Sequence, residues 1–153
     1  MSIPFVKEIE FEYGRVDTLS PLVRRVIANN PGAFTYTGTG VYIIGRGEVA
    51  VIDPGPLLDE HFEALKAALD GETIGHVVVT HSHMDHSPLA HPLAEWAGCE
   101  VYAKGPAIPT ESEVRMEAGD DLTFRPDVTV SDGWTCSGPG WTLEAIETPG
   151  HTS

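Results

Sequence analysis

Residues 77–86 have the sequence Val-Val-Val-Thr-His-Ser-His-Met-Asp-His. The run 74–80 that leads into the histidines is rich in β-branched residues and too short for a typical helix, which predicts a strand covered on both faces. Imidazole and carboxylate are the usual zinc ligands besides thiolate. The loop beyond the carboxyl end of a strand is where open α/β sheets place their sites. We therefore predict a metal site here rather than a solvated loop with chance histidines.

The spacing of these side chains divides them between two ions. His81 and His83, two residues apart in a turn or extended segment, can converge on one ion. Asp85 and His86 continue around the turn and can face a second ion beside the first. Zinc, iron and manganese all accept ligand sets of this kind. The sequence therefore predicts a metal centre and leaves the choice of metal open.

The segments around this stretch predict an α/β fold. Residues 41–44 and 48–52 are β-rich runs around a short turn with two glycines, which predicts a hairpin. The second run ends at Asp53-Pro54-Gly55-Pro56, which cannot continue a central strand. Residues 100–103 predict another strand. Strands alternating with helices are typical of an α/β protein.

Two helices are expected between these strands. Leu58, Phe62, Leu65 and Leu69 form one stripe of an amphipathic helix. Residues 88–98 predict a second helix, with Ser87 as its cap and Gly98 at its end.

The two ends of the chain are less regular. Residues 3–12 show some alternation of apolar and acidic side chains, which predicts a first strand. Residues 105–140 contain several prolines and acidic patches, which favours short strands and long loops. Residues 141–148 alternate apolar with polar side chains and predict a half-buried strand that runs into His151.

Several motifs together resemble the metallo-β-lactamase superfamily. Residues 80–86 are similar to the defining motif of its hydrolases. Residues 51–55, Val-Ile-Asp-Pro-Gly, resemble its strand-end Asp motif. Residues 148–152, Thr-Pro-Gly-His-Thr, resemble its third motif, in which the histidine is a metal ligand. Residues 38–45 are similar to the opening strands of the branch with glyoxalase-II-like and LACTB2-like hydrolases.

This resemblance implies an α/β (α+β) fold, namely the αββα sandwich of the family with two zinc ions at one edge. The chain would supply its N-terminal portion only, a mixed sheet with helices on one face. By match to the motifs, His81, His83 and His151 would bind the first zinc. Asp85 and His86 would bind part of the second. Asp53 would orient the ligand loop by hydrogen bonds.

The chain departs from the family beyond the third motif. A complete family domain continues to a bridging aspartate and one more histidine, and both would lie beyond Ser153. We therefore expect residues 1–153 to form one metallo-β-lactamase-like domain, incomplete at its C-terminus. A C-terminal segment or a symmetric homodimer would then cover the exposed sheet. A non-catalytic, metal-binding half-domain that needs a partner chain is the alternative.

The resemblance also implies a metal-dependent hydrolase that uses a zinc-activated hydroxide. Asp85 would be catalytic, because it would orient the nucleophile or carry its proton. A small-molecule thioester or activated ester, as in the glyoxalase-II-like branch, is the first choice of substrate. A phosphodiester, as for RNA-cleaving members, is the second. A β-lactam is the third, because enzymes with that role usually work outside the cytoplasm.

The charge balance weighs against polyanionic partners. Nine basic and 23 acidic residues give a formal net charge of −14, so nucleic acid is not expected as a partner. The N-terminus has no basic segment followed by an apolar run, and no apolar run is long enough to span a bilayer. Cys99 and Cys136 are expected to be free thiols. These features predict a cytoplasmic protein with no membrane partner.

The remaining histidines have structural interpretations. His61 is expected on the solvated side of its helix, beside Glu60. His76 falls at the start of a strand, and His91 lies near the cluster but outside the motif. Isolated histidines rarely bind a metal without converging partners.

Overall fold

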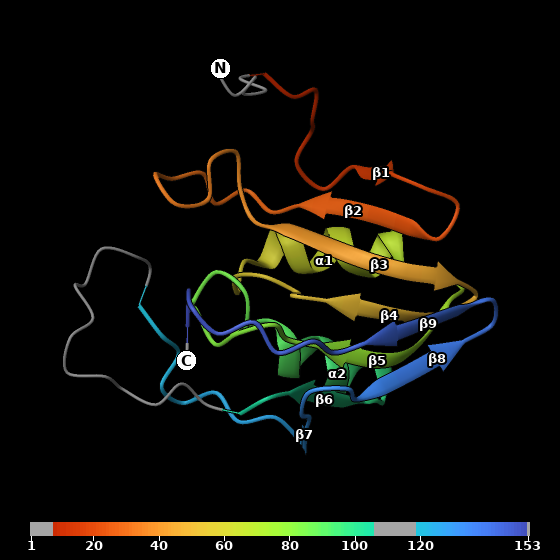
Figure 1. The fold of residues 1–153 in the computed structure, drawn as a ribbon. Helices are drawn as coiled ribbons and strands as arrows, with labels where there is room; N and C mark the ends of the chain where they lie inside the picture. The colour runs from red at the N-terminus through yellow and green to blue at the C-terminus, as the bar shows by residue number, and fades with distance from the viewer. Residues whose placement is uncertain (1–7, 106–118, 153) are drawn as a thin grey trace, which may run out of the picture.

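The computed structural model describes residues 8–105 and 119–152 and shows a large mixed sheet with helices on one face and a hairpin on the other (Figure 1). Its seven strands lie side by side in chain order. Neighbours from β1 to β4 are antiparallel, and neighbours from β4 to β7 are parallel. The strands are β1 (Val16–Thr18), β2 (Val23–Ile27), β3 (Gly40–Arg46), β4 (Glu48–Ile52), β5 (Thr73–Val78), β6 (Glu100–Ala103) and β7 (Val128–Thr129).

The predicted hairpin is confirmed by β3 and β4, which pair with Ile44 opposite Ala50. Gly47 turns the chain between them with a φ of +78°, a left-handed conformation that glycine adopts without steric cost. The predicted strands after the first helix and before residue 104 are likewise confirmed by β5 and β6. Coverage of β5 is complete only on the helix face, where Val77 is fully buried, while Val78 on the other face is partly exposed.

Both predicted helices are present, as α1 (Asp59–Ala68) and α2 (Ala90–Ala97). Gly98 ends α2 in the left-handed conformation, as expected. The predicted cap is wrong, because α2 begins after Leu89 and no side chain caps it. The hydroxyl of Ser87 lies instead 3.2 Å from the carbonyl oxygens of Ser82 and His83. It therefore supports the loop that carries the histidines rather than the helix.

The main core lies between the sheet and the two helices. Leu65 of α1, Leu69 directly after α1 and Leu93 of α2 are almost completely shielded from water. They pack with the inward side chains of β2 to β6, among them Val26, Ile43, Val51, Val77 and Val101. Full burial of one such side chain contributes about 1.5–3 kcal/mol, so this layer supplies most of the apolar stabilisation.

The opposite face is covered by a second, two-stranded sheet made of β8 (Thr135–Gly138) and β9 (Trp141–Glu144). Trp141 anchors this hairpin, because its indole nitrogen donates a hydrogen bond of 3.0 Å to the carbonyl oxygen of Glu48. A Cβ atom at Gly45 would lie only 2.1 Å from that nitrogen. A bare backbone at position 45 is therefore what allows the hairpin to dock on β3.

Two expectations about the less regular parts of the chain are corrected by the structure, and one is confirmed for the described residues. Residues 8–12 form no strand, and residues 3–7 of the expected first strand lie outside the described residues. The strand predicted for 141–148 ends at Glu144. The described part of 105–140 holds the short strands β7 and β8 with turns, as expected, and residues 106–118 lie outside the description.

His61 is buried rather than solvated, since its exposed fraction is 3%. Its Nε2 atom lies 2.8 Å from the carbonyl oxygen of Pro54. Among the described residues, no helix is long and apolar enough to cross a membrane.

Candidate metal centre

The candidate ligands lie at the edge of the sheet where the parallel strands β4 and β5 end. Asp53 follows β4 with a φ of +50°, a left-handed conformation that is uncommon outside glycine but enriched in aspartate. Its carboxylate accepts hydrogen bonds from the backbone N–H and the hydroxyl of Thr80, at 2.8 and 2.7 Å. Asp53 therefore ties the two strand ends together and fixes the start of the histidine loop.

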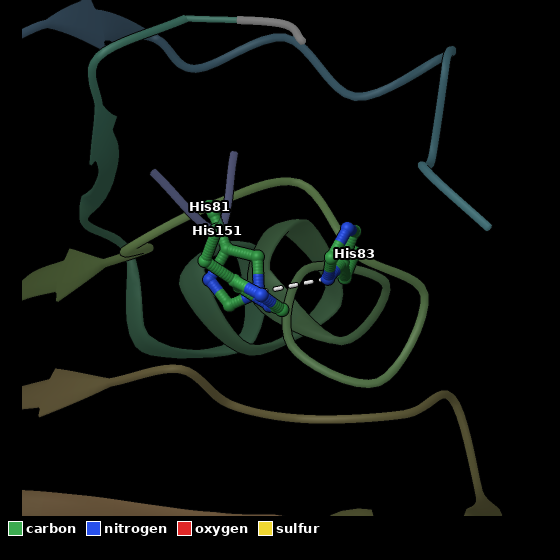
Figure 2. A group of neighbouring side chains, drawn as sticks. All are labelled: His81, His83 and His151. Atoms are coloured by element: carbon green, nitrogen blue, oxygen red, sulfur yellow. Dashed lines mark hydrogen bonds between the residues drawn. The ribbon is translucent and has the colours of Figure 1, made fainter. Parts of the chain in front are cut away.

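His81, His83 and His151 come together in one cluster (Figure 2). One ring nitrogen from each lies within 4.8 Å of the others. A separation of 3.0 Å joins His81 Nε2 to His83 Nδ1. His151 reaches the loop from the C-terminal segment that follows β9, with its ring centroid 5.1 Å from that of His81. Residues far apart in the sequence thus present three imidazole nitrogens to one point.

The donor set of this cluster fits a divalent metal such as zinc. A metal binds the neutral form of imidazole, and burial together with the neighbouring charges of His86 and His83 lowers the pKa of His81 to about 4. The 3.0 Å between His81 Nε2 and His83 Nδ1 is also close to the separation of two ligands on one ion, since atoms about 2.0–2.1 Å from zinc lie roughly 3–4 Å apart. His83 turns Nδ1 toward the cluster and Nε2 toward Asp120, 3.4 Å away.

His86 belongs to a second group of three candidate ligands, with Asp53 and His81. Its Nδ1 lies 3.0 Å from Asp53 Oδ2, and its Nε2 lies 3.2 Å from Asp85 Oδ2. Burial alone would lower the pKa of His86, but the hydrogen bonds and charges of these two carboxylates raise it to about 9. A metal at this second position would therefore have to displace a proton from His86.

Asp85 lies outside both groups of three that the described residues form. Its Oδ2 atom accepts a hydrogen bond of 3.1 Å from the hydroxyl of Thr39 and faces His86. Burial would raise the pKa of Asp85, but these hydrogen bonds and the charge of His86 lower it to about 2. The carboxylate is thus ionised and held beside the cluster.

The loop is clamped by segments that the sequence alone did not connect with it. Met84 N–H donates to the carbonyl oxygen of Gly119, and Asp121 N–H donates to that of Ser82. The sequence analysis also missed Thr39, which contacts Asp85, and Asp120, which contacts His83. Single threonines and aspartates in loops carry no sequence signal of such contacts, because each depends on a segment distant in the chain.

A cavity of about 760 Å³ adjoins the cluster on the hairpin face of the sheet. His81 and Thr152 form part of its wall, and apolar side chains such as Ile52, Val78 and Leu143 form much of the remainder. A predominantly apolar pocket with a few convergent polar groups is typical of a small-molecule site. Among the candidate ligands, His81 is the one that lines this cavity.

The other histidines take structural roles away from the cluster. His91 Nε2 lies 2.6 Å from the carbonyl oxygen of Arg125. His76 packs against the rings of Tyr102 and Trp134. Neither belongs to a group of candidate ligands among the described residues.

Comparison with protein families gives a match over residues 36–153 to the metallo-beta-lactamase superfamily. The chain belongs to this superfamily. Among curated relatives, the beta-lactamase-like protein 2 homolog of Caenorhabditis elegans is 33% identical over 90% of this chain and 45% of its own length. An atrochrysone carboxyl ACP thioesterase of Cryptosporiopsis sp. is 31% identical over 90% of this chain and 39% of its own length.

The solved structures agree on the fold. A subclass B3 metallo-beta-lactamase of Bradyrhizobium japonicum superposes with a TM-score of 0.64 at 20% identity, covering 89% of this chain and 52% of that chain. The chain therefore spans less than half the length of the two curated relatives, and about half the length of this structure.

Proposed function

We propose that this protein is a metal-dependent hydrolase of a small-molecule thioester or activated ester. The observation that carries the proposal is the convergence of three imidazoles, from His81, His83 and His151, where His81 also lines an apolar cavity. Membership of the metallo-beta-lactamase superfamily supports a metal-dependent hydrolase. The thioesterase name of the Cryptosporiopsis relative supports the ester class.

In this proposal His81, His83 and His151 hold the metal, which we take to be zinc. A bound zinc would polarise the substrate oxygen and lower the pKa of a water from 15.7 to about 7. Asp53 keeps the loop in place through Thr80 and His86. Asp85, which is ionised and adjacent to His86, would orient the attacking water or carry its proton. The cavity receives the apolar part of the ester and separates it from bulk water.

The net charge of −14 supports an uncharged or thioester substrate over a polyanionic one. Phosphate backbones would be repelled by such a surface unless the metal's charge dominated locally. A phosphodiester therefore remains the second candidate.

Zinc content and hydrolysis, measured on the same preparations, test the proposal. The wild-type chain and the variants His81→Ala, His83→Ala and His91→Ala would be purified without added metal and analysed for zinc by elemental analysis. An acyl thioester, bis-p-nitrophenyl phosphate and nitrocefin would then be offered to each. His91→Ala is the matched control, because His91 bonds to Arg125 and lies outside the groups of candidate ligands.

We expect zinc and thioester hydrolysis in the wild type and the control, and loss of both in His81→Ala and His83→Ala. Undiminished hydrolysis by metal-free His81→Ala would overturn the mechanism. Faster turnover of nitrocefin or of the phosphodiester would overturn the substrate class. Zinc binding without any hydrolysis would favour a metal-binding module that is not itself catalytic.

A further inference from the structure

Thr39 links the loop before β3 to the candidate centre. It is 5% exposed, and its hydroxyl lies 3.1 Å from Asp85 Oδ2. Behind it, Asn30 makes two contacts with the same residue. The Oδ1 atom of Asn30 lies 2.8 Å from the backbone nitrogen of Thr39, and its Nδ2 atom lies 3.0 Å from the Thr39 hydroxyl oxygen. Asn30, Thr39 and Asp85 thus form a chain of hydrogen bonds.

The chemistry of these groups fixes the direction of every bond in the chain. A backbone N–H can only donate, so the Asn30 atom facing it must be the amide oxygen. The amide nitrogen then faces the Thr39 hydroxyl and donates to its oxygen. The single proton of that hydroxyl is left for Asp85, whose ionised carboxylate can only accept. Asn30 therefore directs the Thr39 hydroxyl toward Asp85.

The loop from residue 30 to residue 39 makes further close contacts around Asn30. Thr35 donates a hydrogen bond of 2.6 Å from its hydroxyl to the carbonyl oxygen of Asn30. Gly38 has a φ of +140°, and a Cβ atom there would lie 1.9 Å from the carbonyl oxygen of Ala28 and 3.1 Å from Asn30 Oδ1. A side chain at position 38 would therefore collide with the backbone and come close to the Asn30 amide oxygen. The Asn30 side-chain amide is therefore in contact with Thr39 and close to the backbone at Gly38.

We propose that Asn30 and Thr39 are positioning residues that set the orientation of the Asp85 carboxylate. His86 Nε2 approaches the same oxygen, Oδ2, at 3.2 Å, so Oδ2 is held between two groups from different segments. A hydrogen bond that holds a catalytic or ligating carboxylate typically affects metal affinity or activity by about 10–100-fold. This inference rests on the proposed role of Asp85, but its metal-affinity readout does not require hydrolysis.

Two substitutions remove the bond to Asp85 by different routes. Thr39→Val keeps the shape of the side chain and removes the hydroxyl, while Thr39→Ser keeps the hydroxyl. Asn30→Asp preserves an acceptor for the Thr39 N–H, yet replaces the amide donor with a second acceptor. The Thr39 proton is then drawn to residue 30 and away from Asp85. Thr142→Val, on the exposed side of β9, is the matched control.

The experiment measures zinc affinity by competition with a chelator, kcat and KM for an acyl thioester, and the unfolding midpoint of each variant. We expect Thr39→Val and Asn30→Asp to weaken zinc binding or lower kcat by about 10–100-fold with KM little changed. Thr39→Ser and Thr142→Val should remain within about threefold of the wild type. The double variant with Thr39→Val and Asn30→Asp should lose no more zinc affinity or kcat than either single variant, because both substitutions remove the same bond to Asp85.

The two proposals fail in distinguishable ways. If no variant and no wild type hydrolyses the thioester, but zinc affinity follows the expected order, the positioning role stands and the proposed function is wrong. If folded Thr39→Val and Asn30→Asp match the wild type in zinc affinity and kcat, the positioning role is wrong. Equal impairment of Thr39→Ser and Thr39→Val would also overturn it, because packing of the methyl group would then be the cause.

Discussion

The two faces of the large sheet are packed in different ways. The helix face holds a continuous layer of almost completely buried side chains from β2 to β6, α1 and α2. Among the described residues, the hairpin face holds a smaller buried cluster of Ile44, Ala50, Cys136 and Trp141, several of whose partly buried neighbours line a cavity of about 760 Å³. That cavity adjoins His81. Stability and access to the candidate centre are therefore supplied by opposite faces of the same strands.

The largest expected effect on the free energy of unfolding concerns the ion pair between Arg24 and Glu72, on the helix face of the sheet. Arg24, on the same face of β2 as Val26, is 6% exposed and makes two contacts with the Glu72 carboxylate, at 2.8 and 3.0 Å. Glu72→Ala would leave this guanidinium buried without its counter-charge. We expect a loss of about 3–5 kcal/mol in the free energy of unfolding, measured in urea.

The matched control is Glu63→Ala, whose carboxylate pairs with Lys66 on α1 and is 71% exposed. We expect it to change the free energy of unfolding by less than about 1 kcal/mol. Similar losses in the two variants would show that burial does not decide the strength of the Arg24 pair.

A pair of leucine truncations compares the two faces directly. Leu65→Ala removes a fully buried side chain from the helix face and should cost about 2–5 kcal/mol. Leu143→Ala removes a partly exposed side chain beside the cavity, where fewer contacts are lost, and should cost about 1 kcal/mol or less. Equal losses in chemical unfolding would mean that the hairpin face is as tightly packed as the helix face.

The smallest expected effect is the pH dependence of the stability that the charged form of Glu72 contributes. Burial alone would raise its pKa, but the hydrogen bonds from Arg24 and Gly47 N–H and the charges of Arg24 and Arg46 lower it below 4.5. A carboxylate with a lowered pKa contributes stability that is complete above its ordinary pKa. That contribution is lost as the pH falls through the lower, folded-state value.

Below about pH 4.5 the wild type should therefore lose stability more steeply than Glu72→Gln, by at most about 1.4 kcal/mol per pH unit. Unfolding curves across an acidic pH series measure this difference. Parallel pH profiles for the two proteins would contradict the assignment of the ion pair.

The sequence predicted the elements whose pattern is local. The β3–β4 hairpin, the stripe of α1 and the strand before the histidines follow directly from periodicity and turn residues. The edge strand β1 and its neighbour β2 were missed, and in β2 Arg24 and Arg25 interrupt the apolar pattern. The charge of the buried Arg24 is neutralised by Glu72, and that partner is distant in the sequence.

For the candidate centre, too, the sequence predicted the motifs but not the contacts between distant residues. The motifs predicted that His81, His83 and His151 would meet, and the structure brings them together. Their roles as ligands, and the role of Asp85, remain predictions. His61 was wrongly assigned to the solvated side, because its burial depends on the carbonyl oxygen of Pro54. Contacts between distant backbone atoms and single side chains leave no periodic signature.

Trp141 packs against two positions that lack side chains. A Cβ atom at Gly138 would lie 2.5 Å from its ring, as one at Gly45 would meet its indole nitrogen. The ring is 6% exposed as a result, whereas Trp96 on α2 is 48% exposed. Indoles in such different surroundings emit at different wavelengths, the shielded one further to the blue. The blue component of the intrinsic fluorescence should therefore report the docking of the hairpin separately from events in the helix layer.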